Sequence, residues 1–360
     1  MLLQRLIPSR KAPRPTLVLL VLSLLLLGSQ PTTASQGDRD PLFQSCLTQC
    51  TTTTCQSPSP LPLSLRLTLW DCPQNCAYTC MHKLTAQRVS SSRPILQYYG
   101  KWPFHRFLGI QEPASVLFSI LNGWAHWVGY KKMRLRVPNW YPLRTLMLLN
   151  ALFGINAWLW SAVFHTRDFP LTEKLDYFSA MASILFATNF CLIRVFNLAK
   201  TSSSHSYNRR YSSSPQHNQR TLLTRLKPYI PPTPQTTLLL LASLTFYTLH
   251  ISYLTLYPFN YTYNIYASII IGFSSNLIWL FWGLSNYNSR PYAWKIVACV
   301  GLITIATGLE VYDFPPVWGV FDAHSLWHGA TVGMVWLFYD FLVADAGWEV
   351  RSSKGKMAAR

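Results

Sequence analysis

Residues 143–165 read LRTLMLLNALFGINAWLWSAVFH, an almost uninterrupted apolar run with Arg144 near its start and His165 at its end. A helix needs about 20 predominantly apolar residues to cross a lipid bilayer. Six other stretches of the chain are long and apolar enough for the same purpose. The sequence therefore predicts seven membrane-spanning helices, over residues 108–130, 143–165, 174–198, 236–257, 262–285, 292–311 and 324–345.

The composition supports a membrane protein. Hydrophobic residues make up 50% of the chain and charged residues only 12%, whereas about a quarter of the residues in a soluble domain are charged. The formal net charge of +18 lies mainly in the loops between apolar stretches, which is the pattern of the positive-inside rule. We therefore interpret the positive charge as a signal of membrane orientation and predict no nucleic-acid partner.

The residues before the first span predict two segments. Residues 1–34 have the basic start and short apolar run of a secretory signal peptide, with a retained signal anchor as the alternative. Residues 35–107 form a lumenal segment that contains six cysteines, Cys46, Cys50, Cys55, Cys72, Cys76 and Cys80. An even number of cysteines in an oxidising compartment predicts three disulfides, with fifteen pairings left open. A zinc module is the less favoured alternative.

Signal cleavage places the N-terminus in the lumen, and seven spans then place the C-terminus in the cytosol. The sequon at Asn260 falls in a predicted lumenal turn, which predicts a glycosylation site. The fold class is thus an all-α membrane protein, a seven-helix bundle over residues 108–346 with a small disulfide-rich lumenal segment. Residues 201–235 form a Ser-rich basic cytosolic loop, and residues 347–360 form a cytosolic tail.

Three histidines are predicted to meet at the lumenal ends of the spans. His165 ends the second span, and His324 and His328 lie four residues apart on one face of the seventh. Three imidazoles are typical of a catalytic zinc site that keeps one coordination position for water. Ionisable residues at membrane depth are rare and usually functional, so we predict zinc as the cofactor. Whether calcium occupies a second site is left open.

Polar residues at the same level predict the rest of the site. Asp176, at the start of the third span, would accept a proton from water and return it to the leaving group. Ser161, one turn before His165, would donate a hydrogen bond to the water or the developing oxyanion. Asp322 would orient a ligating imidazole. In the first span Glu112, Ser115, Ser119, Asn122 and His126 form one stripe facing the bundle interior. Glu112 and Ser115 lie level with the histidines and are further candidate catalytic residues, and Asn122, like Asp322, would support the ligands without binding the metal.

Two other interpretations use the same residues. Histidines at helix interfaces often only form hydrogen bonds between helices. Ser161 could also act as a nucleophile in a relay with His165 and Asp176, although this leaves His324 and His328 unexplained.

The stretches SAVFHTRDFPLTEKLD, residues 161–176, and DAHSLWHG, residues 322–329, resemble motifs of the CREST superfamily of seven-span membrane hydrolases, which includes alkaline ceramidases and the adiponectin-receptor group. QEPASVLFSILN, residues 111–122, resembles the first-span motif of that superfamily. The resemblance implies that the three histidines hold zinc and that Ser161 and Asp176 lie beside the bound water.

The cysteine-rich segment and the stretch QYYGKWPFHRFLGIQEPAS, residues 97–115, are similar to one branch, the GPI-anchor remodelling phospholipase A2 family. This resemblance covers nearly all of residues 38–346. It implies an endoplasmic-reticulum membrane enzyme that removes the sn-2 acyl chain of GPI anchors on proteins, with membrane lipid and GPI-anchored proteins as partners and the oligomeric state left open. The alternatives are a ceramidase-like amidase, a seven-span receptor with a structural zinc, and a folding or cargo-escort role.

Overall fold

The computed structural model describes residues 35–56, 61–199 and 233–358 of the chain. The predicted signal peptide and most of the predicted Ser-rich loop lie outside the described residues. Throughout the described part the regular structure is helical, with three isolated β-bridges in connecting turns and no named strand. The predicted all-α fold class is confirmed.

The N-terminal segment is built on two helices, α2 (Pro41–Thr54) and α4 (Cys72–Ser90), with the short α3 (Leu63–Leu67) between them. Asp40 and Asp71 cap α2 and α4 by accepting hydrogen bonds from backbone N–H groups, as short polar side chains do at helix starts. Three disulfides join the two helices, and they resolve the pairing that the sequence left open. They link Cys46 to Cys80, Cys50 to Cys76 and Cys55 to Cys72.

The order of these disulfides shows how the helices run. Each step forward along α2 is matched by a step backward along α4, so the two helices are antiparallel. Spacings of about four residues keep the cysteines on one face of each helix. A small core of Phe43, Leu84 and Tyr98 packs beside Cys80. Such a small segment buries little apolar surface, and covalent links compensate for that in small disulfide-rich domains.

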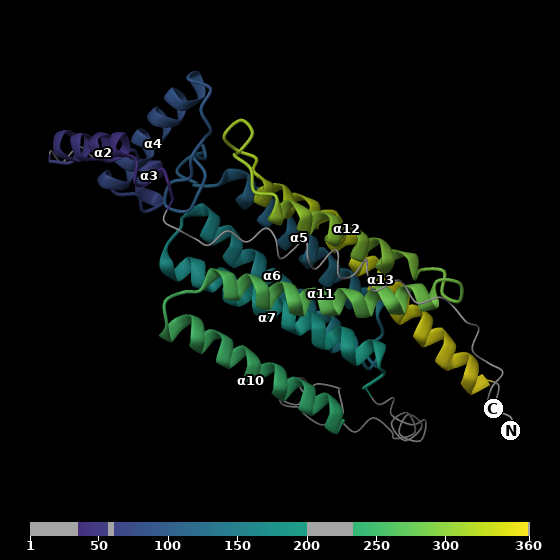
Figure 1. Cartoon of the computed structure of the whole chain (residues 1–360). Helices are drawn as coiled ribbons and strands as arrows, with labels where there is room; N and C mark the ends of the chain where they lie inside the picture. The colour runs from purple at the N-terminus through teal and green to yellow at the C-terminus, as the bar shows by residue number, and fades with distance from the viewer. Residues whose placement is uncertain (1–34, 57–60, 200–232, 359–360) are drawn as a thin grey trace, which may run out of the picture. The chain divides into compact units, whose positions relative to one another are not determined.

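Seven long helices follow in the order that the apolar pattern predicts (Figure 1). They are α5 (Pro113–Arg136), α6 (Arg144–Thr166), α7 (Pro170–Val195), α10 (Pro234–Leu256), α11 (Tyr261–Asn286), α12 (Trp294–Val311) and α13 (Ala323–Ala358).

Among the described residues, five of these helices, α6, α7, α10, α11 and α13, are long and apolar enough to cross a membrane, and α12 is a shorter apolar helix. Helix α5 is more polar because it carries the predicted stripe of polar residues. Ser115, Ser119 and Asn122 are almost completely buried. The stripe therefore faces the interior of the bundle, as predicted.

The helix contacts form a closed circuit. Helix α5 packs between α6 and α13, α7 continues from α6 to α11, and α12 closes the path between α11 and α13. Helix α10 contacts α7 and lies at the margin of the bundle (Figure 1). The largest core cluster lies between these helices and includes Met133, Met147, Phe190, Trp279 and Phe341.

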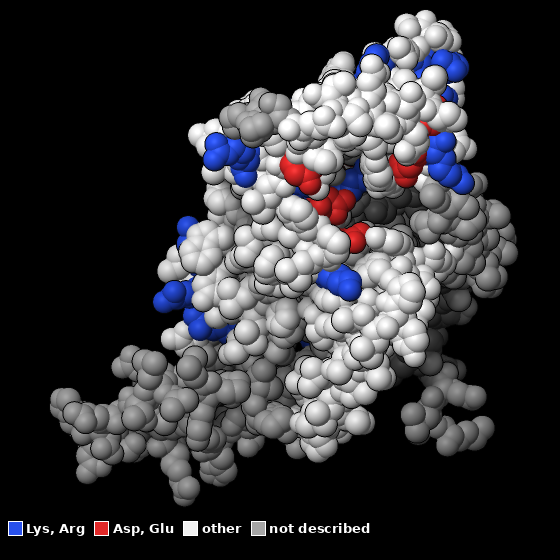
Figure 2. All heavy atoms as spheres, turned by 90° about the vertical axis from the view of Figure 1, so that its left-hand side faces the viewer, with Lys and Arg blue, Asp and Glu red and all other residues white. Residues whose placement is uncertain are grey.

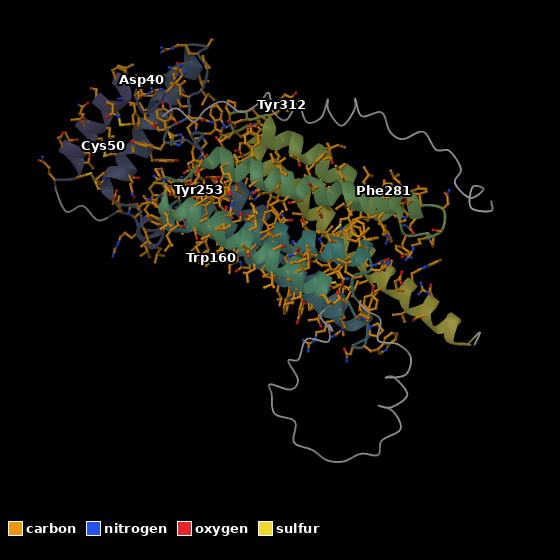
Figure 3. The ribbon with its side chains drawn as sticks, turned by 60° about the horizontal axis from the view of Figure 1, so that its bottom comes forward. Asp40, Cys50, Trp160, Tyr253, Phe281 and Tyr312 are labelled. Atoms are coloured by element: carbon orange, nitrogen blue, oxygen red, sulfur yellow. A yellow bond between two sulfur atoms is a disulfide. The ribbon has the colours of Figure 1, made fainter. Side chains whose placement is uncertain are left out.

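Many apolar side chains point away from this core. Phe281 is 74% exposed, and Leu256 and Ile305 are similarly exposed. Figure 3 shows carbon-rich side chains along the outside of the bundle, including the labelled Phe281. Large apolar surface on the outside of a helical bundle is expected where the surroundings are lipid.

Three helix boundaries differ from the sequence prediction by five residues or more, and one of them is the end of α5, which lies at Arg136 and not near residue 130. Helix α5 begins at Pro113 because residues 107–110 form a tight turn in which Leu108 and Gly109 both have positive φ values. Helix α13 continues beyond the apolar stretch that ends near residue 345 and reaches Ala358. Its last turns are polar, and nothing in hydropathy marks where a helix ends outside the apolar layer.

Candidate metal centre

The three predicted ligands come together between α6 and α13. One nitrogen each of His165, His324 and His328 lies within 4.8 Å of the others. The Nε2 atoms of His324 and His328 are 3.0 Å apart, and the ring of His165 lies 5.1 Å from that of His328, centroid to centroid. His165 and His328 are buried. Three imidazoles from two helices therefore converge on one point.

His165 is oriented by Glu112. The Nδ1 of His165 lies 2.7 Å from Oε2 of Glu112, and the backbone N–H of Glu112 donates to the carbonyl of His165. A carboxylate only accepts, so Nδ1 carries the proton and Nε2 keeps its lone pair. This bond fixes both the tautomer and the angle of the ring, as carboxylates do for metal-ligating histidines.

His328 is oriented by Ser119. The Oγ of Ser119 donates to the carbonyl of Ser115 at 2.7 Å, which uses its single proton. It therefore accepts from Nδ1 of His328 at 3.1 Å and from Oγ of Ser161 at 3.0 Å. The proton of His328 is thus on Nδ1 and the lone pair on Nε2. Sequence reasoning placed Ser119 in the stripe of the first span but gave it no role at the site.

These donors fit zinc. The rings of His165 and His328 donate through Nδ1, which leaves their Nε2 atoms toward the common point, and Nε2 of His324 lies beside that of His328. Neutral imidazole nitrogen is a preferred zinc ligand, and metal-ligating histidines donate their other N–H to a carboxylate, carbonyl or similar acceptor. His165, His324 and His328 are therefore the residues that would hold the metal.

Lys101 is a further member of the site. Its ammonium pairs with Glu112 and lies 3.1 Å from Oδ2 of Asp168. Burial alone would lower the pKa of Lys101, but the two carboxylates outweigh it and raise the pKa above the ordinary value. Lys101 stays charged and supports the carboxylate that holds His165. Sequence reasoning missed it because nothing in the spacing of a lysine before the first span indicates such a partner.

The remaining first-span residues support the same two helices. The Oγ of Ser115 lies 3.5 Å from Oε2 of Glu112. The amide of Asn122 donates to the carbonyl of His328 at 2.8 Å and accepts from the hydroxyl of Thr331. Asn122 therefore fixes the backbone of α13 next to the ligand.

Asp176 and Asp322 both lie near the histidines. Asp176 is in the second turn of α7, close enough to His165 and His324 for their charges to interact. The carboxylate of Asp322 accepts from the backbone N–H of Ser325 at 2.8 Å, and the hydroxyl of Ser325 bonds back to the N–H of Asp322. Asp322 thus caps the helix that carries two of the ligands.

Figure 2 views the molecule from the side where α6 passes into α7 and shows acidic side chains gathered around a hollow, with basic side chains beside them. Among these elements Glu173 accepts from the hydroxyl of Tyr261 at 2.6 Å. The connections before α7 and α11 therefore meet at this end of the bundle. Asn260 caps α11 there by accepting from the N–H of Tyr263.

A second group of potential ligands, Cys55, Cys72 and Cys76, also lies close together. All three sulfurs belong to disulfides, so they are not thiolates that could bind zinc. The other two cysteines of the described residues, Cys191 and Cys299, are buried free thiols packed in the bundle.

Comparison with known proteins gives a family match over residues 62–346, to the Per1-like family. A fission yeast protein named Protein PER1 homolog is 36% identical over 334 residues, which cover 91% of this chain and 92% of that protein. Proteins named GPI-specific phospholipase A2-like PGAP3 from Xenopus laevis and from human are each 36% identical. These alignments cover 90% and 89% of this chain and 94% and 92% of the relatives. No solved structure matches the chain.

Proposed function

Because this chain belongs to the Per1-like family, we propose that it is a membrane-embedded, zinc-dependent hydrolase that removes the sn-2 acyl chain of GPI anchors on proteins. Relatives that span nearly the whole chain are named as GPI-specific phospholipase A2-like proteins. The observation that carries the proposal is the convergence of three imidazole nitrogens, two of them on rings whose opposite nitrogens are held by Glu112 and Ser119.

A zinc ion held by the three histidines would supply a Lewis acid that lowers the pKa of water and polarises an ester carbonyl. The protein's own groups then control the protons. Asp176 takes a proton from the attacking water and returns it to the sn-2 oxygen as the acyl carbon–oxygen bond breaks. The products are a free fatty acid and a lyso lipid. Ser161 donates a hydrogen bond to the oxyanion in place of the bond it makes to Ser119.

The position of the histidines suits an ester of a membrane lipid. His165 lies at the end of α6, and His324 and His328 lie at the start of α13. The sn-2 ester of a lipid lies near the boundary of the hydrocarbon layer, so it reaches helix ends while its acyl chains stay between or beside helices.

The proposal includes a lumenal N-terminus, a cytosolic C-terminus and residence in the endoplasmic reticulum, with signal cleavage and glycosylation at Asn260.

The serine relay is less consistent with the contacts. It needs the hydroxyl of Ser161 to donate to His165 and His165 to be oriented by Asp176. The contacts instead join Ser161 to Ser119 and Nδ1 of His165 to Glu112. A metal centre uses both of these bonds, whereas the relay uses neither.

The test is metal content and sn-2 release by the purified full chain beside His324→Ala/His328→Ala. We expect about one zinc per chain in the wild type and the loss of both zinc and activity in the double variant. His250→Gln is the control, because His250 is buried like His328 but lies in α10. An active wild type without metal would overturn the zinc proposal and favour the serine relay.

A second variant separates an enzyme from a receptor. Asp176→Asn should keep the zinc and the fold but lose turnover by at least 100-fold, since the proton acceptor is removed. Unchanged turnover would contradict the proton-transfer role. Ceramide offered to the same preparation distinguishes an amidase from an ester hydrolase.

A further inference from the structure

A second polar site lies toward the opposite ends of α5 and α13 from the histidines. A cavity of about 530 Å³ opens between the last turns of α5, the start of α12 and the second half of α13. Four basic side chains and one carboxylate line it: Lys132, Arg136, Lys295, Arg351 and Asp340. None of these residues contributes to the candidate metal centre.

The positive charges of this basic cavity outnumber the carboxylates that pair with them. Lys132 and Lys295 share the single carboxylate of Asp340. Arg136 and Arg351 pair with no carboxylate in the part of the chain that the structure describes. Arg351 folds back over α13, with its guanidinium next to Gly347. Two of the four cations therefore face the cavity without an anionic partner.

The start of α12 adds a favourable field for an anion. Pro291, Tyr292 and Lys295 contribute to the wall of the cavity, and α12 begins at Trp294 without a side-chain cap or an acidic residue in its first turn. The N-terminus of a helix carries partial positive charge, which attracts phosphate and other anions. The basic side chains and the partial positive charge at the start of α12 would therefore both attract an anion in the cavity.

The rest of the wall is apolar. Val343, Ala344 and Trp348 line the same cavity, and the ring of Trp348 lies 6.1 Å from that of Tyr292. Tryptophan is enriched where a membrane helix meets the polar headgroups. An occupant of this cavity would therefore meet positive charge on one side and an apolar surface on the other, which matches a lipid better than a free ion.

We propose that this basic cavity binds the phosphate-bearing headgroup of an anionic membrane lipid. Basic pockets between the cytosolic ends of membrane helices are suited to such headgroups, and the negative lipids of the cytosolic leaflet supply them. The binding is separate from the hydrolysis proposed above, and it rests only on the orientation proposed there, with this end of the helices in the cytosol. It would link α5, α12 and α13 through one ligand.

The test is binding of dioctanoyl phosphatidylinositol 4-phosphate to the purified full chain in neutral detergent, with dioctanoyl phosphatidylcholine as the uncharged comparison. We expect saturable binding of the anionic lipid only. Arg136→Gln/Arg351→Gln should weaken it by roughly tenfold to thirtyfold, because each basic residue contributes about 1 kcal/mol to anionic lipid binding.

The matched control is Lys131→Gln/Arg134→Gln, which removes two exposed charges from the same helix end but outside the cavity. We expect it to bind like the wild type. Asp340→Asn should tighten binding by several fold, since it removes the only carboxylate of the cavity. Equal weakening by both double variants would overturn the proposal, because the effect would then be one of total charge.

Inorganic phosphate separates a lipid from a soluble ligand. We expect phosphate to compete only at concentrations at least 100-fold above those of the lipid. Competition at similar concentrations would overturn the assignment to a lipid and give the cavity to a soluble phosphate compound. Unchanged zinc content and elution profile in each variant would show that the fold is intact.

Discussion

At one end of the bundle Arg194 is held by Asp345 and Glu349, whereas at the other end three histidine nitrogens face one another around a common point. The Arg194 network joins α7, α13 and the connection before α12, since Arg290 and Tyr292 bond to the same two carboxylates. Each of its charges has an opposite partner. At the histidine end, by contrast, the Nε2 atoms of His324 and His328 lie 3.0 Å apart and ligand atoms of all three rings face one another, an arrangement that a bound cation would stabilise.

The difference shows how to distinguish structural from functional polar groups inside a membrane protein. Both ends are buried and both use hydrogen bonds between distant helices. In the Arg194 network, each charged side chain pairs with a side chain of opposite charge within the protein. In the candidate metal centre, Glu112 and Ser119 satisfy the outer nitrogens of two rings and leave the inner nitrogens available.

The largest effect on stability is expected from Arg194→Gln. It leaves the buried carboxylate of Asp345 without its main partner, and breaking a buried ion pair in this way costs about 3–5 kcal/mol. Thermal unfolding of the purified chain measures the change. Arg134→Gln is the control, because Arg134 is exposed and its loss should matter little. A melting temperature equal to that of the wild type would show that the Arg194 network does not hold the helices together.

The largest effect on zinc affinity without loss of a ligand is expected from Glu112→Gln. The amide cannot replace the carboxylate that orients His165 and pairs with Lys101, so zinc affinity and sn-2 release should both fall by roughly 10–100-fold. Metal titration and turnover measure these together.

Glu173→Gln is the matched control for this variant, since Glu173 is at the same end but bonds to Tyr261. If both variants lower zinc affinity equally, the effect comes from the negative charge of the region and not from the bond to His165.

A smaller loss, roughly tenfold in zinc affinity, is expected for Ser119→Ala. The variant removes the acceptor for Nδ1–H of His328, which then loses its fixed tautomer. Ser275→Ala, which also removes a buried serine hydroxyl but from α11, should leave zinc affinity unchanged. Wild-type affinity in Ser119→Ala would mean that another group orients His328.

The smallest effect is expected at Asp322. Asp322→Ala should lower stability by about 1 kcal/mol through loss of the helix cap, whereas Asp322→Asn should be close to the wild type because asparagine caps equally well. Thermal unfolding and turnover of both variants test this. A strong loss of turnover in Asp322→Asn alone would support the predicted role of the carboxylate in orienting an imidazole.

The positions of the bundle helices could be predicted closely. The stretch predicted over residues 143–165 is the helix Arg144–Thr166, and that predicted over residues 262–285 is Tyr261–Asn286. Hydropathy and the helical repeat depend on residues that are neighbours in the sequence, so they can be recognised without knowing which other helices a helix contacts. The prediction was poorer at the start of α5, where a turn has no hydropathy signal, and at the ends of α5 and α13, where the helices continue into polar residues.

The candidate ligands could also be predicted, since three histidines at the ends of apolar stretches stand out by composition. Their tautomers could not, because the proton of His328 depends on Ser119, and that of His165 depends on Glu112, in other helices. The role of Lys101 could not be predicted either, because it depends on the contacts of Lys101 with Glu112 and Asp168, which only the folded chain brings together.

The sequence by itself determined a helical membrane protein with six cysteines before its bundle and three histidines at its helix ends, because apolar length, spacing and residue type are written along the chain. The tertiary structure alone decided which cysteines pair, which side chains hold the histidine rings, and that four basic residues surround one cavity. These depend on contacts between residues far apart in sequence, and only the packing of the helices brings those residues together.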